Sequence, residues 1–388
     1  MSNFHVALKK VVDDSYDVQI GCGLIDDMIQ DIKEGLVGNK KKFAVITDSN
    51  VDEVYGRPVL EKILAAGYQG DLFVFAAGEK SKVRKTKEEI EDAMLAKGYR
   101  RDCCVIAVGG GVVTDLAGFL AGTFGRGVPV IHYATTLLAA ADASIGGKTA
   151  VDTDLATNLI GLIYQPKKVY VDIDAWKTLP KRHLINGLAE TIKHACLADY
   201  ELFTYLEEHW QDILSCDKEA CTYISEHNCK VKYEVVMKDE KENNLREILN
   251  LGHTVGRAIE TVSDYRLLHG EALSIGMTAQ VLLGYRSGYL SKKECERVIT
   301  LQQAVGLPVR IPEYIDREEL VKKLYTDKKV RDGRLRFVFQ KGIGDVMTFG
   351  EETYARCVSE EEIRAVLMDD TVLKNRFIIT PEKPEKEG

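Results

Sequence analysis

Short apolar runs alternate with amphipathic stretches through the first 180 residues of the chain. The amphipathic stretches carry apolar residues at helical spacing and lie at about 59–66, 85–97 and 112–122. The apolar runs are continuous, as in strands buried on both faces, and lie at 42–47, 71–75, 103–108, 128–132 and 168–172. This alternation predicts an α/β fold with a mostly parallel sheet that helices cover on both faces.

The pattern changes after Pro180, where helical periodicity replaces the strand-like runs. We expect helices at about 183–197, 200–214, 217–238, 243–262 and 271–286, followed by shorter ones. The chain from Lys374 onward is charged and contains proline, which predicts a disordered tail. The sequence therefore predicts an α/β domain over 1–180, an all-helical domain over 181–373 and a tail over 374–388.

Composition excludes several classes of protein. At 388 residues the chain is long enough for two domains that each bury a core. A net charge of −8 argues against general nucleic-acid binding, so an anionic ligand must be held by a local cluster of cations. No stretch reaches the roughly 20 apolar residues of a membrane span, and the first residues lack the apolar centre of a signal peptide. Nine cysteines without a Cys-x-x-Cys pair predict reduced thiols in the cytoplasm.

The stretch from Leu245 to Met277 carries an unusual polar stripe. On a helix at about 100° per residue, the residues that share one face are Arg246, Asn250, His253, Arg257 and Glu260. The opposite face is apolar, with Leu251, Val255, Ile259 and Val262. A solvated amphipathic helix is one interpretation. However, Gly252 and Gly256 each cost roughly 1 kcal/mol inside a helix, which indicates that another element packs close to this backbone.

A metal site is the second interpretation of the same stretch. His253 is followed by His269, which begins the next helical run, so the two imidazoles can converge on one ion. Glu190 lies on an otherwise apolar helix, where a carboxylate is buried only when it is paired or bound to a metal. The three residues predict a Glu/His/His site with an open position for substrate oxygens.

Other polar residues follow the predicted strands. Gly109–Gly111 come directly after the 103–108 run and before a helix, where backbone N–H groups can bind a pyrophosphate. A turn that needs glycine for steric reasons alone is the alternative. Four more candidates lie at the ends of other strands, where dinucleotides bind in parallel sheets: Asp48, Asn50, Glu79 and Lys82.

Cations and polar groups form a further candidate set. The segment Thr135–Gly161 holds too many Gly, Thr and Asp residues for a simple helix, and a structural loop is its plainest interpretation. Side chains that can reach a polyhydroxylated, phosphorylated ligand are Asp142, Lys148, Asn158, Lys193, Lys232, Lys328, Lys329 and Arg126. Each of these cations taken alone is more often a surface charge.

Taken together, these motifs resemble the 3-dehydroquinate synthase family of the sugar-phosphate cyclase superfamily. The resemblance extends from about Asp48 to Val346 and rests on GGGVVTDLAGFLAGTFGRG, TTLLAAADASIGGKTAVDT, NLIGLIYQPKKVYVD, LAETIK, LREILNLGHTVGRAIE, LHGEALSIGM and DKK. It implies a Rossmann-like N-terminal domain, a helical metal-binding C-terminal domain, bound NAD, one divalent ion (zinc or cobalt) and a homodimer.

The resemblance also implies roles for individual residues. The metal ligands would be Glu190, His253 and His269. The catalytic set would be Asp142, Lys148, Lys193, Lys232, Arg246, Asn250 and Arg257. Further substrate contacts would be Arg126 (from the partner of a dimer), Asn158 and Lys328. The NAD contacts would be Asp48, Asn50, Glu79, Lys82, Gly110, Gly111, Val112, Asp115, Thr135, Thr136, Lys148, Thr157 and Thr178.

The activity implied is the conversion of 3-deoxy-D-arabino-heptulosonate 7-phosphate to 3-dehydroquinate and phosphate. Its steps would be transient oxidation by NAD, elimination of phosphate, re-reduction and intramolecular aldol closure, as in the shikimate pathway to the aromatic amino acids. Two positions depart from the family: Thr157 stands where a lysine is usual, and Arg257 stands where a second histidine is usual. A cyclase acting on another sugar phosphate, an NAD- and metal-dependent polyol dehydrogenase and a non-catalytic relative are therefore the alternatives.

Overall fold

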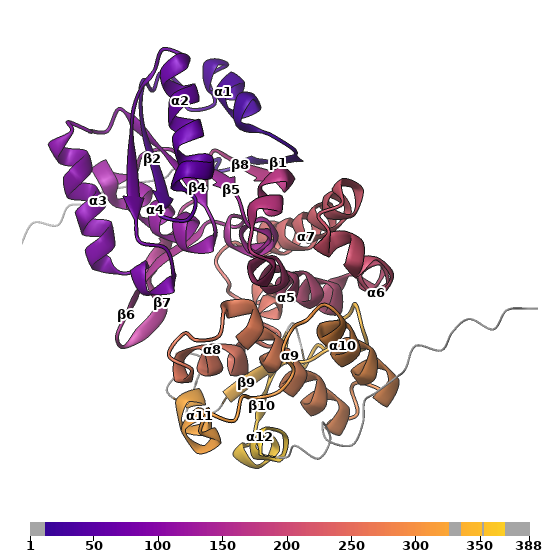
Figure 1. The fold of residues 1–388 in the computed structure, drawn as a ribbon. Coiled ribbons are helices and arrows are strands. Elements are labelled where there is room, and N and C mark those ends of the chain that lie inside the picture. The colour runs from indigo at the N-terminus through magenta and orange to yellow at the C-terminus, as the bar shows by residue number, and fades with distance from the viewer. Residues whose placement is uncertain (1–11, 326–334, 351–352, 369–388) are drawn as a thin grey trace, which may run out of the picture.

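A computed structural model describes residues 12–325, 335–350 and 353–368 of the chain. Its N-terminal part is built on one six-stranded, all-parallel sheet in the order β3-β2-β4-β5-β8-β1 (Figure 1). The strands are β1 (Asp17–Gly21), β2 (Lys42–Asp48), β3 (Gln69–Phe75), β4 (Cys103–Gly109), β5 (Val130–Ala134) and β8 (Lys168–Asp172). Five of them confirm the apolar runs of the sequence, whereas β1 was not predicted.

Both faces of the sheet are buried, which explains the continuous apolar runs. Phe43 and Val45 of β2 pack under α1 (Ile25–Lys33) and α2 (Arg57–Ala65). Ala44 and Ile46 point the other way and pack under α3 (Arg84–Ala96) and α4 (Gly111–Thr123). Because neighbouring side chains on a strand point to opposite faces, each central strand must be apolar at every position.

The connections reverse direction in the middle of this sheet. From β2 the chain runs outward to β3 on one side, and from β4 it continues to β5 and β8 on the other. In open parallel sheets the crevice at such a reversal, outside the carboxyl ends of the strands, is where nucleotides bind. Here the crevice lies beyond Asp48 of β2 and Gly109 of β4.

An antiparallel hairpin lies within Thr135–Gly161, where a structural loop was one interpretation of the sequence. After a π-helical turn, η4 (Ala139–Ala143), the chain forms β6 (Lys148–Thr153) and β7 (Ala156–Ile163). β6 packs closely on α4, where a Cβ at Gly118 would lie 2.4 Å from Thr149. The hairpin extends away from the sheet toward the helical part (Figure 1).

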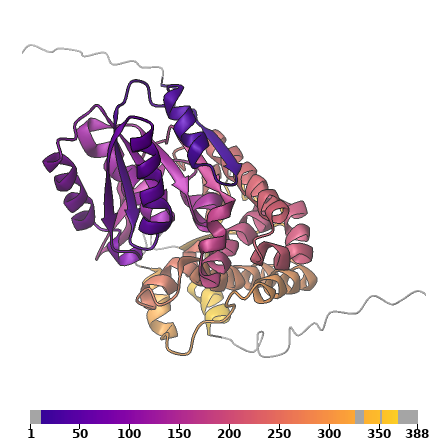
Figure 2. The ribbon, with the colours of Figure 1, turned by 45° about the horizontal axis from the view of Figure 1, so that its top comes forward.

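Helices dominate the chain after Pro180, as predicted, and Figure 2 shows them as a layer beside the sheet. They are α5 (Lys181–Ala198), α6 (Tyr200–Leu214), α7 (Lys218–Lys238), α8 (His253–Val262), α9 (His269–Arg286), α10 (Lys292–Ala304), α11 (Arg317–Leu324) and α12 (Glu360–Leu367). A small antiparallel pair, β9 (Leu335–Val338) with β10 (Ala355–Val358), interrupts them and was not predicted. Val169 and Val171 of β8 share one apolar cluster with α5, so the two parts are packed together.

The predicted continuous helix over 243–262 is wrong. Residues Leu245–Asn250 form a 3-10 turn, η6, and α8 starts only at His253. Between them Gly252 has a φ of +75°, and a Cβ there would lie 2.5 Å from Met277 Cγ of α9. The backbone turns because α9 packs directly against it, which is the close approach that the glycines indicated.

Several expectations lie outside the described residues. These are Lys328, Lys329 and the disordered tail. Among the residues that are described, no helix is long and apolar enough to cross a membrane.

Candidate active site

Glu190, His253 and His269 come together from three helices, α5, α8 and α9. Glu190 lies in the middle of α5, while each histidine is the first residue of its helix, α8 or α9. Nε2 of His269 lies 3.1 Å and Nε2 of His253 lies 3.4 Å from Glu190 Oε1. The three ligand atoms fall within 4.8 Å of one another. One carboxylate and two imidazoles at this spacing suit a divalent ion with a position left for substrate.

The second nitrogen of each imidazole is also engaged. His269 Nδ1 lies 3.3 Å from Glu260 Oε2, and His253 Nδ1 lies 3.2 Å from the carbonyl of Leu251. Such outer partners fix the ring orientation of metal-binding histidines. Burial lowers the pKa of His253 to about 3, which favours the neutral imidazole that a metal ligand must be. At His269 the effect of burial is outweighed by Glu260 and Glu190, which raise its pKa to about 10, so a metal ion that binds there must displace a proton. The residues present therefore fit a metal ion.

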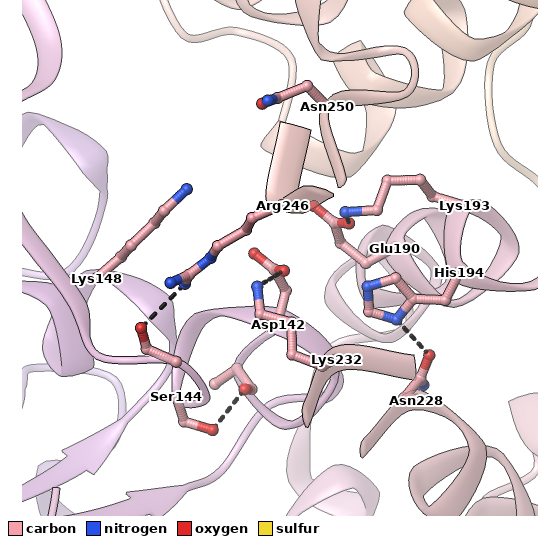
Figure 3. A network of polar contacts seen from close by, with 12 residues as sticks. Asp142, Ser144, Lys148, Glu190, Lys193, His194, Asn228, Lys232, Arg246 and Asn250 are labelled. Atoms are coloured by element: carbon pink, nitrogen blue, oxygen red, sulfur yellow. Dashed lines mark hydrogen bonds and ion pairs between the residues drawn. The ribbon is translucent and has the colours of Figure 1, made fainter. Parts of the chain in front are cut away.

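A second acidic group lies beside this set. Asp142, Glu190 and His194 also have their ligand atoms within 4.8 Å of one another. However, Lys232 forms an ion pair with Asp142, and Lys193 forms one with Glu190 (Figure 3). A cation between Asp142 and His194 would face both ammonium groups. The electrostatics therefore favour the site formed with His253 and His269.

The predicted substrate cations line the same space. Figure 3 shows Lys148, Arg246 and Asn250 on one side of Asp142. The Arg246 guanidinium is buried and donates to the carbonyls of Glu240 and Gly146, while its Nε has no partner among the described residues. That Nε is a buried donor which no described residue satisfies.

Glu242 lies among the predicted site residues, although the sequence reasoning did not single it out. Its carboxylate accepts from Lys148 Nζ at 2.5 Å and from Asn250 Nδ2 at 3.0 Å, so it binds two predicted substrate contacts. Burial lowers the pKa of Lys148 to about 8, although 47% of its side chain is exposed. The backbone of Glu242 is in the left-handed region, with a φ of +56°. The one signal for Glu242 in the sequence is its position between the motifs LAETIK and LREILNLGHTVGRAIE.

The carboxyl edge of the sheet has the features of a nucleotide site. α4 begins at Gly111 without a side-chain cap on its first N–H groups. A Cβ at Gly110 would lie 3.1 Å from Thr136, and one at Gly111 would lie 3.2 Å from Ala143. The buried Thr135 hydroxyl has no partner among the described residues. Free N–H groups, close packing and a free hydroxyl fit a bound pyrophosphate.

Beside this edge, Lys82 is buried among acidic groups. Its Nζ lies 2.5 Å from Glu79 and 3.3 Å from Asp115, and it donates to Asn158 Oδ1 at 2.9 Å. Asp152, which was not predicted, joins the cluster by accepting from the Asn158 N–H. Burial alone would lower the pKa of Lys82, but the carboxylates outweigh it and raise the pKa. Asn158, predicted to contact substrate, thus lies with the predicted NAD contacts.

The remaining predicted residues lie at the periphery of these groups. Asp48 accepts from the Asn50 N–H at the end of β2, Val112 lies in the first turn of α4, and the Thr178 hydroxyl donates to the Ala175 carbonyl. Arg126 is exposed just after α4, with a φ of +69°.

The two departures from the family pattern lie in the same place. Thr157 of β7 and Arg257 of α8 line one cavity between the hairpin and the helix. Arg257 forms no ion pair with either of the carboxylates that follow it, Glu260 and Asp264, among the described residues; these pair with His269 and Lys80.

Comparison with known sequences gives consistent matches. Models of the 3-dehydroquinate synthase N-terminal and C-terminal regions match residues 72–186 and 187–330. A 3-dehydroquinate synthase of Caldanaerobacter subterraneus subsp. tengcongensis is 43% identical over 329 residues, which is 84% of this chain and 92% of that protein. One of Desulforamulus reducens is 40% identical over 354 residues, 91% of this chain and 96% of that protein.

Solved structures show the same architecture. A 2-epi-5-epi-valiolone synthase from Streptomyces hygroscopicus subsp. jinggangensis, with NAD⁺ and Zn²⁺ bound, has a TM-score of 0.84 and 30% identity, covering 96% of this chain and all (100%) of that one. A 2-deoxy-scyllo-inosose synthase complexed with carbaglucose-6-phosphate, NAD⁺ and Co²⁺ has a TM-score of 0.81 and 25% identity, covering 90% of this chain and 95% of that one.

Proposed function

Because the chain belongs to the 3-dehydroquinate synthase family, we propose that it converts 3-deoxy-D-arabino-heptulosonate 7-phosphate to 3-dehydroquinate and phosphate. It is then a carbon–oxygen lyase acting on a phosphate, and its steps are oxidation, phosphate elimination, re-reduction and aldol closure. The observation that carries this proposal is the convergence of Glu190, His253 and His269 beside a cluster of buried lysines.

Two bound groups complete the site. NAD supplies reversible hydride transfer, and a divalent ion, zinc or cobalt, supplies Lewis acidity toward the substrate oxygens. Glu190, His253 and His269 would hold the ion, and the start of α4 together with Thr135 would hold the pyrophosphate of NAD.

The other side chains bind and orient the substrate. Arg246 Nε and Asn250 would hold the substrate carboxylate, and Lys148 and Lys328 would neutralise its phosphate. Lys193 and Lys232 are buried beside acidic partners, so they would donate hydrogen bonds to substrate hydroxyls in a site shielded from water. Asn158 accepts a hydrogen bond from Lys82, so it would lie between the substrate and the predicted NAD contacts.

The wider organisation follows from the same arrangement. We propose that 1–180 form the NAD-binding domain and 181–373 the metal- and substrate-binding domain, with the substrate held between them. We also propose a homodimer in which the exposed Arg126 reaches the site of the partner. A cytoplasmic location is supported by the nine cysteines, none of which is paired.

Incubation of the pure protein with the heptulosonate phosphate, NAD and zinc or cobalt tests the proposal. Phosphate release should match formation of the carbocycle one for one, and NADH should not accumulate, because each hydride is returned. The matched control is His253→Ala, which removes a ligand and should abolish both products. Steady NADH production from a phosphate-free alcohol, without cyclisation, would instead identify a polyol dehydrogenase.

A further inference from the structure

The cavity that holds both departures from the family pattern has a volume of about 80 Å³. It lies between the hairpin β6–β7 and the helical part, and three separate segments form its walls. The hairpin contributes Thr153 and Thr157, α8 and the turn after it contribute Arg257 and Tyr265, and α11 contributes Lys323. Its lining is therefore rich in cations and hydroxyl groups.

The charge balance of this cavity favours an anion. Arg257 and Lys323 are the cations of the lining and Asp154 is its one carboxylate; Glu260, on the same helix as Arg257, is near enough for the two charges to interact but pairs with His269. Arg257 is half-buried, and no carboxylate of a described residue forms an ion pair with its guanidinium. The guanidinium presents a planar fork of donors that suits phosphate or carboxylate oxygens.

The turn that carries Tyr265 is held in an unusual conformation. Asp264 and Tyr265 have φ values of +52° and +56°, a region that residues with a side chain seldom adopt twice in succession. Lys80 Nζ, from the sheet part, lies 3.4 Å from Asp264 Oδ2 and ties this turn to the opposite side of the cleft. Such backbone strain clusters where the chain positions a ligand. The strained turn therefore fixes the Tyr265 wall of the cavity.

We propose that this cavity is an anion subsite that binds a phosphate group, with Arg257 as its anchor and the Thr157 hydroxyl as a donor from the facing strand. The occupant is either the inorganic phosphate released in the reaction or the phosphate of the sugar phosphate, which would then lie here and not against Lys148 and Lys328. The inference rests on the proposed function and assigns a specificity-determining role to the two residues in which this chain departs from its family. A lysine at 157 would place a third cation in the cavity, whereas threonine adds a donor without a charge.

Titration of inorganic phosphate into the NAD- and metal-loaded protein tests the subsite directly. Arg257→Gln should weaken phosphate binding by about tenfold or more, because a charge-assisted contact is lost. Arg257→Lys should retain part of the affinity as a point charge, and Thr157→Val should lose roughly threefold to tenfold. The matched control is Arg266→Gln, because Arg266 is exposed, stacks on Tyr314 and does not line the cavity.

Steady-state kinetics separate the two sources of phosphate. If the substrate phosphate occupies the cavity, Arg257→Gln raises both the KM for the sugar phosphate and the inhibition constant of inorganic phosphate. If only released phosphate binds there, the inhibition constant rises and the KM stays unchanged.

One result would refute the anion subsite, and another would refute the proposed function. Wild-type phosphate affinity and an unchanged inhibition constant in a folded Arg257→Gln protein would overturn the subsite and leave the proposed function standing. If the wild-type protein does not cyclise the heptulosonate phosphate, the proposed function fails, and the phosphate titration still decides whether the cavity binds anions.

Discussion

Replacing Glu190 with glutamine removes one charge from a fully buried ion pair. The side chains of Glu190 and Lys193 are 0% and 1% exposed. The amide has nearly the shape of the carboxylate, so the main effect is that the Lys193 ammonium loses its counter-charge. Breaking a buried pair in this way costs about 3–5 kcal/mol. In the metal-free protein we therefore expect Glu190→Gln to lower the Tm by at least about 5 °C.

Differential scanning calorimetry in the presence of a chelator measures this shift, and calorimetric titration with zinc measures the metal site. The double variant Glu190→Gln/Lys193→Met removes the stranded charge, so it should regain part of the Tm but not the metal affinity. The matched control is Glu53→Gln. Glu53 pairs with Arg57 where both side chains are exposed (76% and 53%), and such pairs contribute only about 0–1 kcal/mol.

Two results would refute this reasoning. An unchanged Tm for Glu190→Gln in chelator would mean that the Lys193 charge is not stranded. Stoichiometric zinc binding with wild-type affinity would mean that Glu190 is not a ligand, whatever the effect on stability.

Two further predictions concern a cation and a turn. The pKa of Lys148 is lowered to about 8, so its ammonium is charged below that pH, and the KM for the sugar phosphate should rise as the pH passes it. The Lys148→Arg variant stays charged, so its KM should not change over this pH range. Identical pH profiles of KM for the wild type and the variant would exclude Lys148 from anion binding. Gly252→Ala combines a φ of +75° with a Cβ 2.5 Å from Met277 and should cost about 2–5 kcal/mol in denaturant unfolding. Gly288→Ala, with the same φ and no neighbour within 4 Å, should cost about 1–2 kcal/mol, and equal costs would contradict the packing argument.

The sequence by itself determined the class of fold and the candidates for chemistry. Burial on both faces leaves a local signature, because a strand such as β4 must then be apolar at every position. A carboxylate among apolar residues is equally visible, which is why Glu190 stood out on its helix before any partner was known. The glycines at 252 and 256 likewise indicated a close neighbour, although they could not say that it was α9.

Only the tertiary structure decided where the chain bends and which distant residues meet. The break at Gly252 depends on Met277 of α9, and helical periodicity carries no information about that contact. The position of Glu242 between Lys148 and Asn250 joins segments that are 94 residues apart in the chain. Thr157 and Arg257 line one cavity because the hairpin β6–β7 packs against α4 and extends toward α8. Side chains brought together by packing between elements leave no local pattern, since their spacing along the chain is set by the fold alone.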